Sequence, residues 1–309
     1  PAVTAANGCT SIGWKLNETD AKYYTAAEVL KYPVTEDTTW YAYSVKSTIV
    51  ISGGGGSVVE KETVVYRDGG LGGSVDEWLD TTDHFAYIIG NEAGLIRPTA
   101  NISRAEAATI FFRLLKENVR ATYWRTDNRF SDVDSGMWYN NAVSTSAQLG
   151  ILMGYPDGSF VGTGSITRAE FATIAARFLN RAYTGANRFT DIGGHWAAKY
   201  INTAAEQGWL EGYPDGTFRP EQPITRAEAV TVVNRMLGRD KLDGGSFTSD
   251  VKTWSDAPAS AWYYNAIEEA TNSHDYERGT DGVERWSKLN TARDWAALEK
   301  AWSTANSGK

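Results

Sequence analysis

The chain has 309 residues, of which 42% are hydrophobic and 22% charged, and 30 Lys and Arg against 38 Asp and Glu give a net charge of −8. This composition is typical of a folded protein and excludes wholesale disorder. The acidic balance disfavours nucleic acid as a partner, because phosphate backbones are bound mainly by clustered Lys and Arg. No apolar run approaches the roughly 20 residues that cross a bilayer, so no membrane span is expected.

The N-terminal part predicts a partial β-rich module at residues 1–50 and a Gly-rich linker at 51–76. Apolar Trp40 and Ala42 alternate with aromatic residues at 41 and 43, which is typical of a strand. The run SGGGGS at 52–57 indicates a flexible linker. No Gly-Lys-Ser/Thr follows that run, so a phosphate-binding loop is not expected there.

Three repeated copies follow the linker. The second copy (residues 130–180) and the third copy (189–238) share GYPDG and ITRAE, and they align without a gap from Trp138 and Trp196 onward. The first copy, at about 83–116, is shorter: it contains ISRAE but lacks the segment that precedes the loop. Such internal repetition is the signature of a repeat architecture.

Each complete copy predicts a helix, a long ordered loop and a second helix. In the third copy, Trp196, Ile201 and Ala204 recur at helical spacing, and Gly208 lies where that helix would end. The loop GYPDGTFRP is rich in turn-forming residues. After ITRAE, apolar residues again recur at helical spacing. We therefore expect a mainly α fold built from helix–loop–helix units, preceded by the small β-rich module.

The missing first helix of the first copy is expected near the other end of the chain. Residues 254–273 begin with WSD and place Trp262 and Ile267 at the spacing found in the two complete copies. We predict that this segment packs against the first copy and completes a closed three-unit ring, so that the repeat domain covers 77–275. The alternative is a remnant that caps nothing. Tryptophan and leucine residues farther on predict a C-terminal helical extension over 276–309.

The start of each second helix predicts a capping box. In this motif the Ser or Thr hydroxyl accepts from the N3 amide, and the Glu carboxylate reaches back to the cap amide. The expected structural caps are Ser103 with Glu106, Thr167 with Glu170, and Thr225 with Glu228.

Capping does not explain the arginine that follows each cap. Arg104, Arg168 and Arg226 fall at the first helical position, where a cation opposes the helix dipole. Free backbone N–H groups and a planar guanidinium can share one carboxylate or phosphate. We therefore expect the three arginines to bind an anion. The alternative is a salt bridge between units, for example to a neighbouring Asp.

Together these motifs resemble the S-layer homology domain family. The resemblance rests on His195-Trp196-Ala197, on the loop from Gly212 to Pro220 and on Ile224 to Glu228, and it covers residues 83–273. It implies a pseudo-threefold helical domain of three repeats, with grooves that bind a secondary cell-wall polymer. In the family this polymer commonly carries a pyruvyl ketal, whose carboxylate meets the TRAE arginine. Residues 11–45 resemble the end of a Listeria–Bacteroides repeat, a small β-rich module of bacterial surface proteins.

The resemblance also implies that loop residues line the grooves. The expected ligand-binding residues are the three arginines with Tyr155, Asp157, Gly158, Tyr213, Asp215 and Gly216. The aspartates could instead form turns, and the tyrosines could either pack or stack on a sugar. In the first copy, GNEAG at 90–94 replaces GYPDG, so a groove built from that loop is expected to bind weakly or not at all. The tryptophans of the first helices are expected in the core: Trp138, Trp196 and Trp262.

We therefore expect a non-catalytic, monomeric anchor on the bacterial cell surface, secreted by a signal outside this sequence and bound to an anionic wall glycan. No cofactor or metal ion is expected. His84, His195 and His274 form no metal-binding spacing, Cys9 is the one cysteine, and the Asp132–Gly136 run lacks the later Glu of a calcium loop. The rival interpretations are an S-layer self-assembly module and, less favoured, a glycan hydrolase, which would need two placed carboxylates.

Overall fold

The structure is a computed structural model that describes residues 11–15, 41–45, 71, 73–179 and 183–307. The chain forms two units, Pro1–Asp68 and Gly69–Lys309. In the first unit, β1 (Ser11–Lys15) pairs antiparallel with β2 (Tyr41–Val45). The strand expected near residue 41 is thus present, and the repeat family of this module stays a prediction. Most of the expected linker lies outside the described residues.

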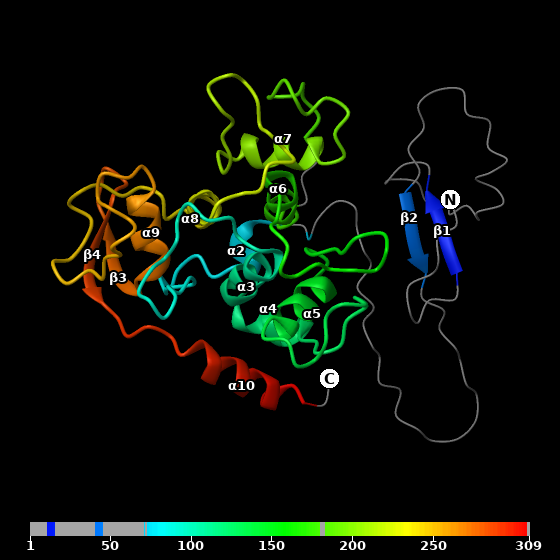
Figure 1. The fold of residues 1–309 in the computed structure, drawn as a ribbon, viewed down its shortest axis with the longest axis horizontal. Helices are drawn as coiled ribbons and strands as arrows, with labels where there is room; N and C mark the ends of the chain where they lie inside the picture. The colour runs from blue at the N-terminus through cyan, green and yellow to red at the C-terminus, as the bar shows by residue number, and fades with distance from the viewer. Residues whose placement is uncertain (1–10, 16–40, 46–70, 72, 180–182, 308–309) are drawn as a thin grey trace. The chain divides into compact units, whose positions relative to one another are not determined.

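The described part of the second unit is mainly helical, as expected (Figure 1). A two-stranded antiparallel hairpin, β3 (His274–Arg278) with β4 (Glu284–Leu289), lies beside α9 in the ribbon (Figure 1). Among the described residues, no helix is long and apolar enough to cross a membrane. The helices are α2 (Val75–Trp78), α3 (Arg104–Leu114), α4 (Glu117–Tyr123), α5 (Asn140–Leu149), α6 (Arg168–Ala176), α7 (Ala198–Glu206), α8 (Arg226–Leu237), α9 (Tyr264–Thr271) and α10 (Trp295–Ala305).

Capping boxes fix the starts of α3, α6 and α8, and all three expected pairs are present. In α3, the Glu106 amide donates to Ser103 Oγ at 3.2 Å, and the Ser103 amide donates to Glu106 Oε2 at 2.8 Å. These bonds satisfy amides that the helix itself cannot pair. At the other end of α8, Gly238 takes the left-handed conformation (φ 68°) that glycine adopts most easily.

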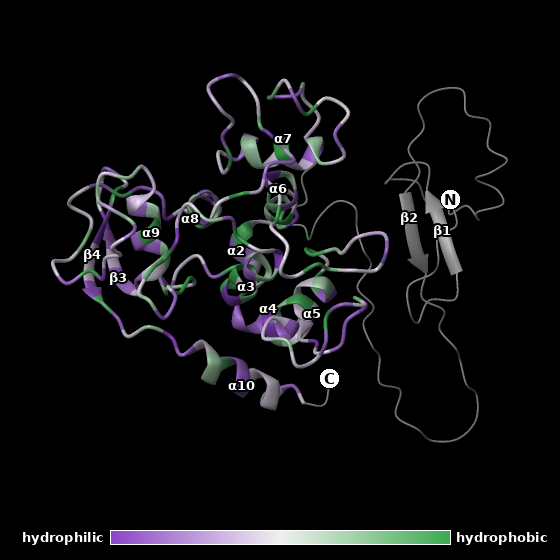
Figure 2. Ribbon diagram, in the orientation of Figure 1, coloured by the Kyte–Doolittle hydropathy of each residue, from purple (hydrophilic) through white to green (hydrophobic). Residues whose placement is uncertain are grey.

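The core consists of helix pairs, in which α3 packs on α5, α6 on α7 and α8 on α9. Small residues such as Ala105 and Ala108 are buried in α3, so its backbone can approach its neighbours closely. Larger rings fill the centre: Phe111 lies 5.5 Å from Phe171 and 5.5 Å from Phe178 between ring centroids. Figure 2 shows helices such as α5 and α10 carrying both hydrophobic and hydrophilic residues. Burial of their apolar side chains stabilises the unit.

An aspartate before each first helix holds the loop of a copy. In the second copy, Asp132 accepts from the Phe160 amide at 2.6 Å and from the Val161 amide at 2.7 Å. In the third copy, Asp191 does the same for the amides of Phe218 and Arg219. The second amide of each pair belongs to a non-glycine residue with positive φ, 56° at Val161 and 57° at Arg219. The carboxylate thus holds a backbone conformation that costs energy in isolation.

Residues 254–273 contact the first copy in the same manner. Asp256 accepts from the amides of Ile96 and Arg97, at 3.1 and 2.7 Å. Arg97 also has positive φ, 52°. The Tyr87 amide donates to the Ala270 carbonyl at 3.0 Å. The first copy therefore takes from residues 254–273 the contacts that the other copies make within themselves.

Three backbone hydrogen bonds connect the copies in a cycle just before the capping boxes. The Ile102 amide donates to the Ile224 carbonyl at 3.1 Å, and the Ile224 amide donates to the Ile166 carbonyl at 3.0 Å. The Ile166 amide donates to the Ile102 carbonyl at 3.1 Å, which completes the cycle. All three isoleucines are buried.

The C-terminal extension is only partly helical, which corrects the expectation for 276–309. Strand β3 begins at His274, and β4 follows after a turn in which Gly282 has a φ of 77°. At the start of β4, Glu284 and Trp286 are buried and Arg285 between them is partly exposed, which is the period-two pattern of a strand over three residues only. The helix α10 comes after the hairpin and buries Trp295 and Trp302.

Candidate functional site

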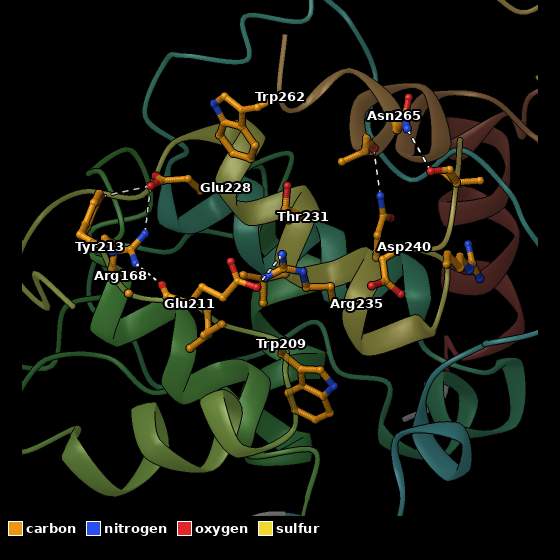
Figure 3. Close-up of a pocket in the computed structure, with 17 residues that line it drawn as sticks. Arg168, Trp209, Glu211, Tyr213, Glu228, Thr231, Arg235, Asp240, Trp262 and Asn265 are labelled. Atoms are coloured by element: carbon orange, nitrogen blue, oxygen red, sulfur yellow. Dashed lines mark hydrogen bonds and ion pairs between the residues drawn. The ribbon is translucent and has the colours of Figure 1, made fainter. Parts of the chain in front are cut away.

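The arginine after each cap is buried and makes three hydrogen bonds. Arg168, from the second copy, contacts the loop of the third copy. Its Nε donates to the Phe218 carbonyl at 2.9 Å, and its Nη2 donates to the Glu211 carbonyl at 3.2 Å. Its Nη1 donates to Glu228 Oε1 at 2.9 Å, and its guanidinium lies 4.9 Å from the centroid of the Tyr213 ring. Figure 3 shows these side chains converging on one hollow.

The same arrangement recurs at the other two arginines. Arg104 pairs with Glu170, and Arg226 pairs with Glu106, each at 2.7 Å. The salt bridge between units, which the sequence left as an alternative, is therefore present at all three positions. Its partner is the capping glutamate of another copy rather than an Asp. Each glutamate uses Oε2 for its own helix cap and Oε1 for the arginine.

The salt bridge does not use every donor of the guanidinium. An arginine carries five N–H groups. Arg168 directs three of them to Phe218, Glu211 and Glu228. One N–H on each terminal nitrogen is left without a hydrogen bond to the described residues. An oxygen of a bound anion could accept from these two groups, so the salt bridge and anion binding are compatible.

Two cavities are lined by two of these arginines, Arg104 and Arg168. Groove A has a volume of about 570 Å³ and is lined by Arg104, Tyr155, Glu170, Arg177 and Trp196, among others. Groove B has a volume of about 380 Å³ and is lined by the corresponding residues Arg168, Tyr213, Glu228, Arg235 and Trp262, among others. Each tyrosine hydroxyl donates to the capping glutamate, at 2.9 Å in groove A and 3.3 Å in groove B.

The tryptophans of the first helices are exposed, so the expectation that they lie in the core is wrong. Trp138, Trp196 and Trp262 are 62%, 58% and 68% exposed. The helices α5 and α7 begin two residues after their tryptophans, at Asn140 and Ala198. The tryptophans therefore precede the first turn, and the apolar stripe of the helix does not extend to them. Exposed indole rings beside a polar cavity are suited to stacking on a sugar.

A second arginine in each groove was missed from the sequence. Arg177 lines groove A and donates to the Ile151 carbonyl at 3.1 Å. Arg235 lines groove B and pairs with Glu211 at 3.1 Å. Together with Arg113 they occupy the same position after ISRAE or ITRAE in all three copies. The recurrence of arginine at this position of the repeats is the signal that could have identified them.

The loop aspartates form turns. Asp157 accepts from the amide and hydroxyl of Ser159, and Asp215 accepts from those of Thr217. Hydrogen bonds from Thr217 lower the pKa of the Asp215 carboxyl to about 2. The following Gly158 and Gly216 have φ values of 86° and 79°. Of the expected ligand residues, Arg104, Arg168 and the two tyrosines line grooves A and B. Arg226 and these aspartates and glycines are not among the lining residues of the two grooves.

The third arginine has a different surrounding. Arg226 Nη2 donates to the Ile89 carbonyl at 3.4 Å. In this loop, Asn91 stands at the position that Tyr155 and Tyr213 occupy in the other two copies. Asn91 accepts from the Leu95 amide at 2.9 Å. The second arginine of this set, Arg113, lies 4.8 Å from the Trp295 ring centroid, and burial lowers its pKa to about 10. Helix α10 thus covers an arginine whose counterparts line grooves A and B.

Groove A has a balanced charge. Arg104 and Arg177 lie among its lining residues together with Glu170 and Glu221, so two positive groups oppose two negative groups. Groove B is balanced in the same way, with three arginines against two glutamates and one aspartate. An anion would therefore be held by direct contact with N–H groups at short range, and a general positive field does not attract it.

Comparison with known proteins gives matches over the repeat region. Residues 129–172 and 188–230 match the S-layer homology domain family. A cellulosome-anchoring protein of Acetivibrio thermocellus is 38% identical over 210 residues, or 66% of this chain and 46% of that protein. Cell surface glycoprotein 1 of the same species is 34% identical over 232 residues, or 71% of this chain and 9% of that protein. Exoglucanase XynX, also from Acetivibrio thermocellus, is 28% identical over 250 residues, or 76% of this chain and 22% of that protein.

This chain spans less than half the length of each of these relatives. Two relatives are named as surface or anchoring proteins and one as an enzyme, so the shared segment accompanies different whole proteins. The two family matches fall on the second and third copies, where grooves A and B have their tyrosines. The chain therefore contains an S-layer homology domain, with repeats recognised at residues 129–172 and 188–230.

Proposed function

We propose that this chain is a non-catalytic module that anchors a protein to the bacterial cell surface by binding a cell-wall polymer in grooves A and B. The observation that carries the proposal is the recurrence of one set of side chains in both grooves: a buried arginine with spare N–H groups, a tyrosine over it and an exposed tryptophan at the rim. The S-layer homology matches and the anchoring and surface proteins among the relatives support it.

We further infer that the three copies form a pseudo-threefold ring. The cyclic hydrogen bonds among Ile102, Ile166 and Ile224 support this inference, as do the three equivalent salt bridges. In this arrangement residues 254–273 supply the first helix of the first copy, and each groove lies where two copies meet. The ring therefore positions the arginine of one copy against the capping glutamate of another.

The chemistry of the grooves favours an anionic glycan as ligand. A sugar ring has flat C–H faces that pack on tryptophan or tyrosine. A carboxylate on that sugar, such as that of a pyruvyl ketal, could accept from the two spare N–H groups of Arg104 or Arg168. The glutamates already bound to each arginine leave room for one such group and disfavour a highly charged ligand.

The groove at Arg226 contributes little in this proposal. Asn91 replaces the tyrosine, and Trp295 lies over Arg113. We therefore assign polymer binding to grooves A and B. The exposed Trp138, which belongs by position to the third groove, provides a matched control for tests on Trp196 and Trp262.

The test is co-sedimentation of the chain with purified cell-wall sacculi, before and after chemical removal of the secondary polymer. Binding to untreated sacculi and loss of binding after treatment are expected. The double variant Trp196→Ala with Trp262→Ala should lose most of the binding, whereas Trp138→Ala should retain it. All three side chains are largely exposed, so these substitutions should change stability little.

Four outcomes would contradict parts of the proposal. Equal binding to treated and untreated sacculi would identify peptidoglycan itself as the ligand. Equal losses for the Trp138 variant and the double variant would show that grooves A and B are not the binding sites. Absence of binding, with concentration-dependent association in size-exclusion chromatography, would favour the self-assembly interpretation. Release of soluble sugar from the wall would show a hydrolase.

A further inference from the structure

We propose that His84, His274 and Glu269 form a binding site for a divalent transition-metal ion such as Zn²⁺, with Glu284 as the fourth side chain. The site lies where the start of the first copy meets α9 and the C-terminal hairpin. It is separate from grooves A and B, and its test does not depend on polymer binding. The sequence did not reveal it because its ligands come from distant parts of the chain.

The nearest ligand atoms of His84, His274 and Glu269 lie at separations close to those of neighbouring ligands in a tetrahedral site. His84 Nδ1 lies 3.0 Å from His274 Nε2 and 3.0 Å from Glu269 Oε1. Glu269 Oε2 lies 3.4 Å from His274 Nε2, and Glu284 Oε2 lies 3.6 Å from His84 Nδ1. Metal–ligand distances of about 2.0–2.1 Å in a tetrahedron put neighbouring ligand atoms about 3.3 Å apart. His84, His274 and Glu269 therefore lie close enough to hold one ion, and Glu284 approaches the cluster at His84.

The cluster contains buried polar atoms that lack hydrogen bonds. The side chains of His84, His274, Glu269 and Glu284 are all 0% exposed. Both carboxylate oxygens of Glu269 and Oε2 of Glu284 have no hydrogen-bond partner among the described residues. An ion that accepts lone pairs from the Glu269 carboxylate and from His84 Nδ1 would give these buried groups a partner.

Outer contacts hold the ligands in the required orientation. His274 Nδ1 lies 3.1 Å from the Asn272 carbonyl, so Nδ1 carries the proton and Nε2 presents its lone pair to the cluster. The His274 ring stacks on Trp286 with centroids 3.8 Å apart, and the His84 ring stacks on Tyr276 at 3.9 Å. Arg278 pairs with Oε1 of Glu284, which leaves Oε2 of that carboxylate toward His84.

The ligand types select the class of ion. Two imidazoles with carboxylates suit Zn²⁺ and its neighbours among the divalent transition metals, whereas Ca²⁺ and Mg²⁺ prefer sets made only of oxygen. A hollow of about 420 Å³ is lined by His84 and His274 among others, which gives an ion a route to the cluster. Because the site joins residue 84 to residues 269–284, a bound ion would hold together two parts of the chain that are far apart in sequence.

The experiment uses the full 309-residue chain after dialysis against a chelator. Equilibrium dialysis with ZnCl₂, and separately with CoCl₂, measures stoichiometry and affinity. One ion per chain and the visible absorption of four-coordinate Co²⁺ are expected. At free zinc a hundredfold above Kd, the thermal midpoint should rise by roughly 5–10 °C.

Variants assign the bound ion to the cluster. His274→Ala should abolish binding, and Glu269→Gln, which keeps the shape of the side chain, should weaken affinity at least about tenfold. His195→Ala and Cys9→Ser remove the other possible nitrogen and sulfur ligands and should leave one ion bound. Circular dichroism confirms that each variant is folded, and Glu269→Gln serves as the test if His274→Ala is not.

Two results would overturn the proposal. If the wild-type chain binds no Zn²⁺ or Co²⁺, the cluster is a buried hydrogen-bond network between histidines and carboxylates. If binding persists unchanged in a folded His274→Ala or in Glu269→Gln, or disappears in Cys9→Ser, the ion lies elsewhere. Polymer binding by Trp196 and Trp262 would be unaffected by either result, so the two proposals fail independently.

Discussion

The substitution Arg168→Ala should strongly destabilise the repeat domain. The guanidinium of Arg168 donates to two backbone carbonyls, of Phe218 and Glu211, and to the carboxylate of Glu228. Its side chain is 7% exposed, so water cannot easily replace these donors. The change would therefore remove three hydrogen bonds, one of which is the salt bridge between the second and third copies.

The size of the effect follows from these partners. A buried carbonyl left without a donor costs about 1–3 kcal/mol, and removing one partner of a buried ion pair costs about 3–5 kcal/mol. Glu228 is 21% exposed and keeps its bond from Tyr213, which reduces the second cost. We expect a loss of about 3–5 kcal/mol in the free energy of unfolding, or a fall of roughly 6–20 °C in the thermal midpoint.

Thermal and urea unfolding followed by circular dichroism would measure this loss. The control is Arg219→Ala, because Arg219 is 46% exposed and its contacts, with the exposed Asp215 and over the Tyr213 ring at 3.9 Å, are at the surface of one copy. An exposed pair contributes about 0–1 kcal/mol, so this control should unfold close to the wild-type midpoint. If Arg168→Ala unfolds at the same midpoint as Arg219→Ala, the salt bridges between copies do not stabilise the domain. The arginine would then be retained for its ligand alone.

The remaining predictions concern single loops and the C-terminal helix. Asp191→Ala should cost about 1–3 kcal/mol in urea unfolding, because two amides lose their acceptor; an unchanged urea midpoint would refute the role given to this aspartate. Gly212→Ala should cost about 1–3 kcal/mol, since a Cβ there would overlap a phenylalanine ring and a carbonyl. Gly136→Ala, where a Cβ meets nothing within 4 Å, is its control. Trp295→Ala should lower the free energy of unfolding by about 3–5 kcal/mol, because its buried ring is removed. If this variant loses less stability than a variant of an exposed tryptophan, such as Trp138→Ala, α10 does not pack on the repeat domain.

The sequence predicted the repeated elements well because local rules determine them. Capping pairs such as Thr225 with Glu228 lie within one turn, and their geometry depends on nothing distant. The second helices and the loops between them follow from the same short-range patterns. The predicted contacts of residues 254–273 with the first copy were accessible as well, because internal repetition shows what each copy lacks.

Other features depend on the arrangement of distant residues. Trp196 lies just before its helix begins, so a helical pattern extended by two residues misplaced it in the core. Whether Arg168 meets a carboxylate or a free anion depends on another copy's glutamate, and the sequence left both possibilities open. The cluster of His84, Glu269 and His274 is created only when the hairpin packs beside α9. No spacing rule within a short segment contains that information.

The contact of residues 254–273 with the first copy has a consequence for the order in which the copies fold. In the second copy, Asp132 and the Phe160 amide that it binds are 28 residues apart in sequence. In the first copy, Asp256 and the Ile96 amide are 160 residues apart. For an unfolded chain, the longer loop costs about 1.5 kcal/mol more in closure entropy. The second and third copies can therefore form while the chain is still being synthesised, and the first must wait for residue 256 and α9. Amides of Ile96 and Arg97 should accordingly gain protection last in pulsed hydrogen exchange, which makes the first copy the slow step of folding.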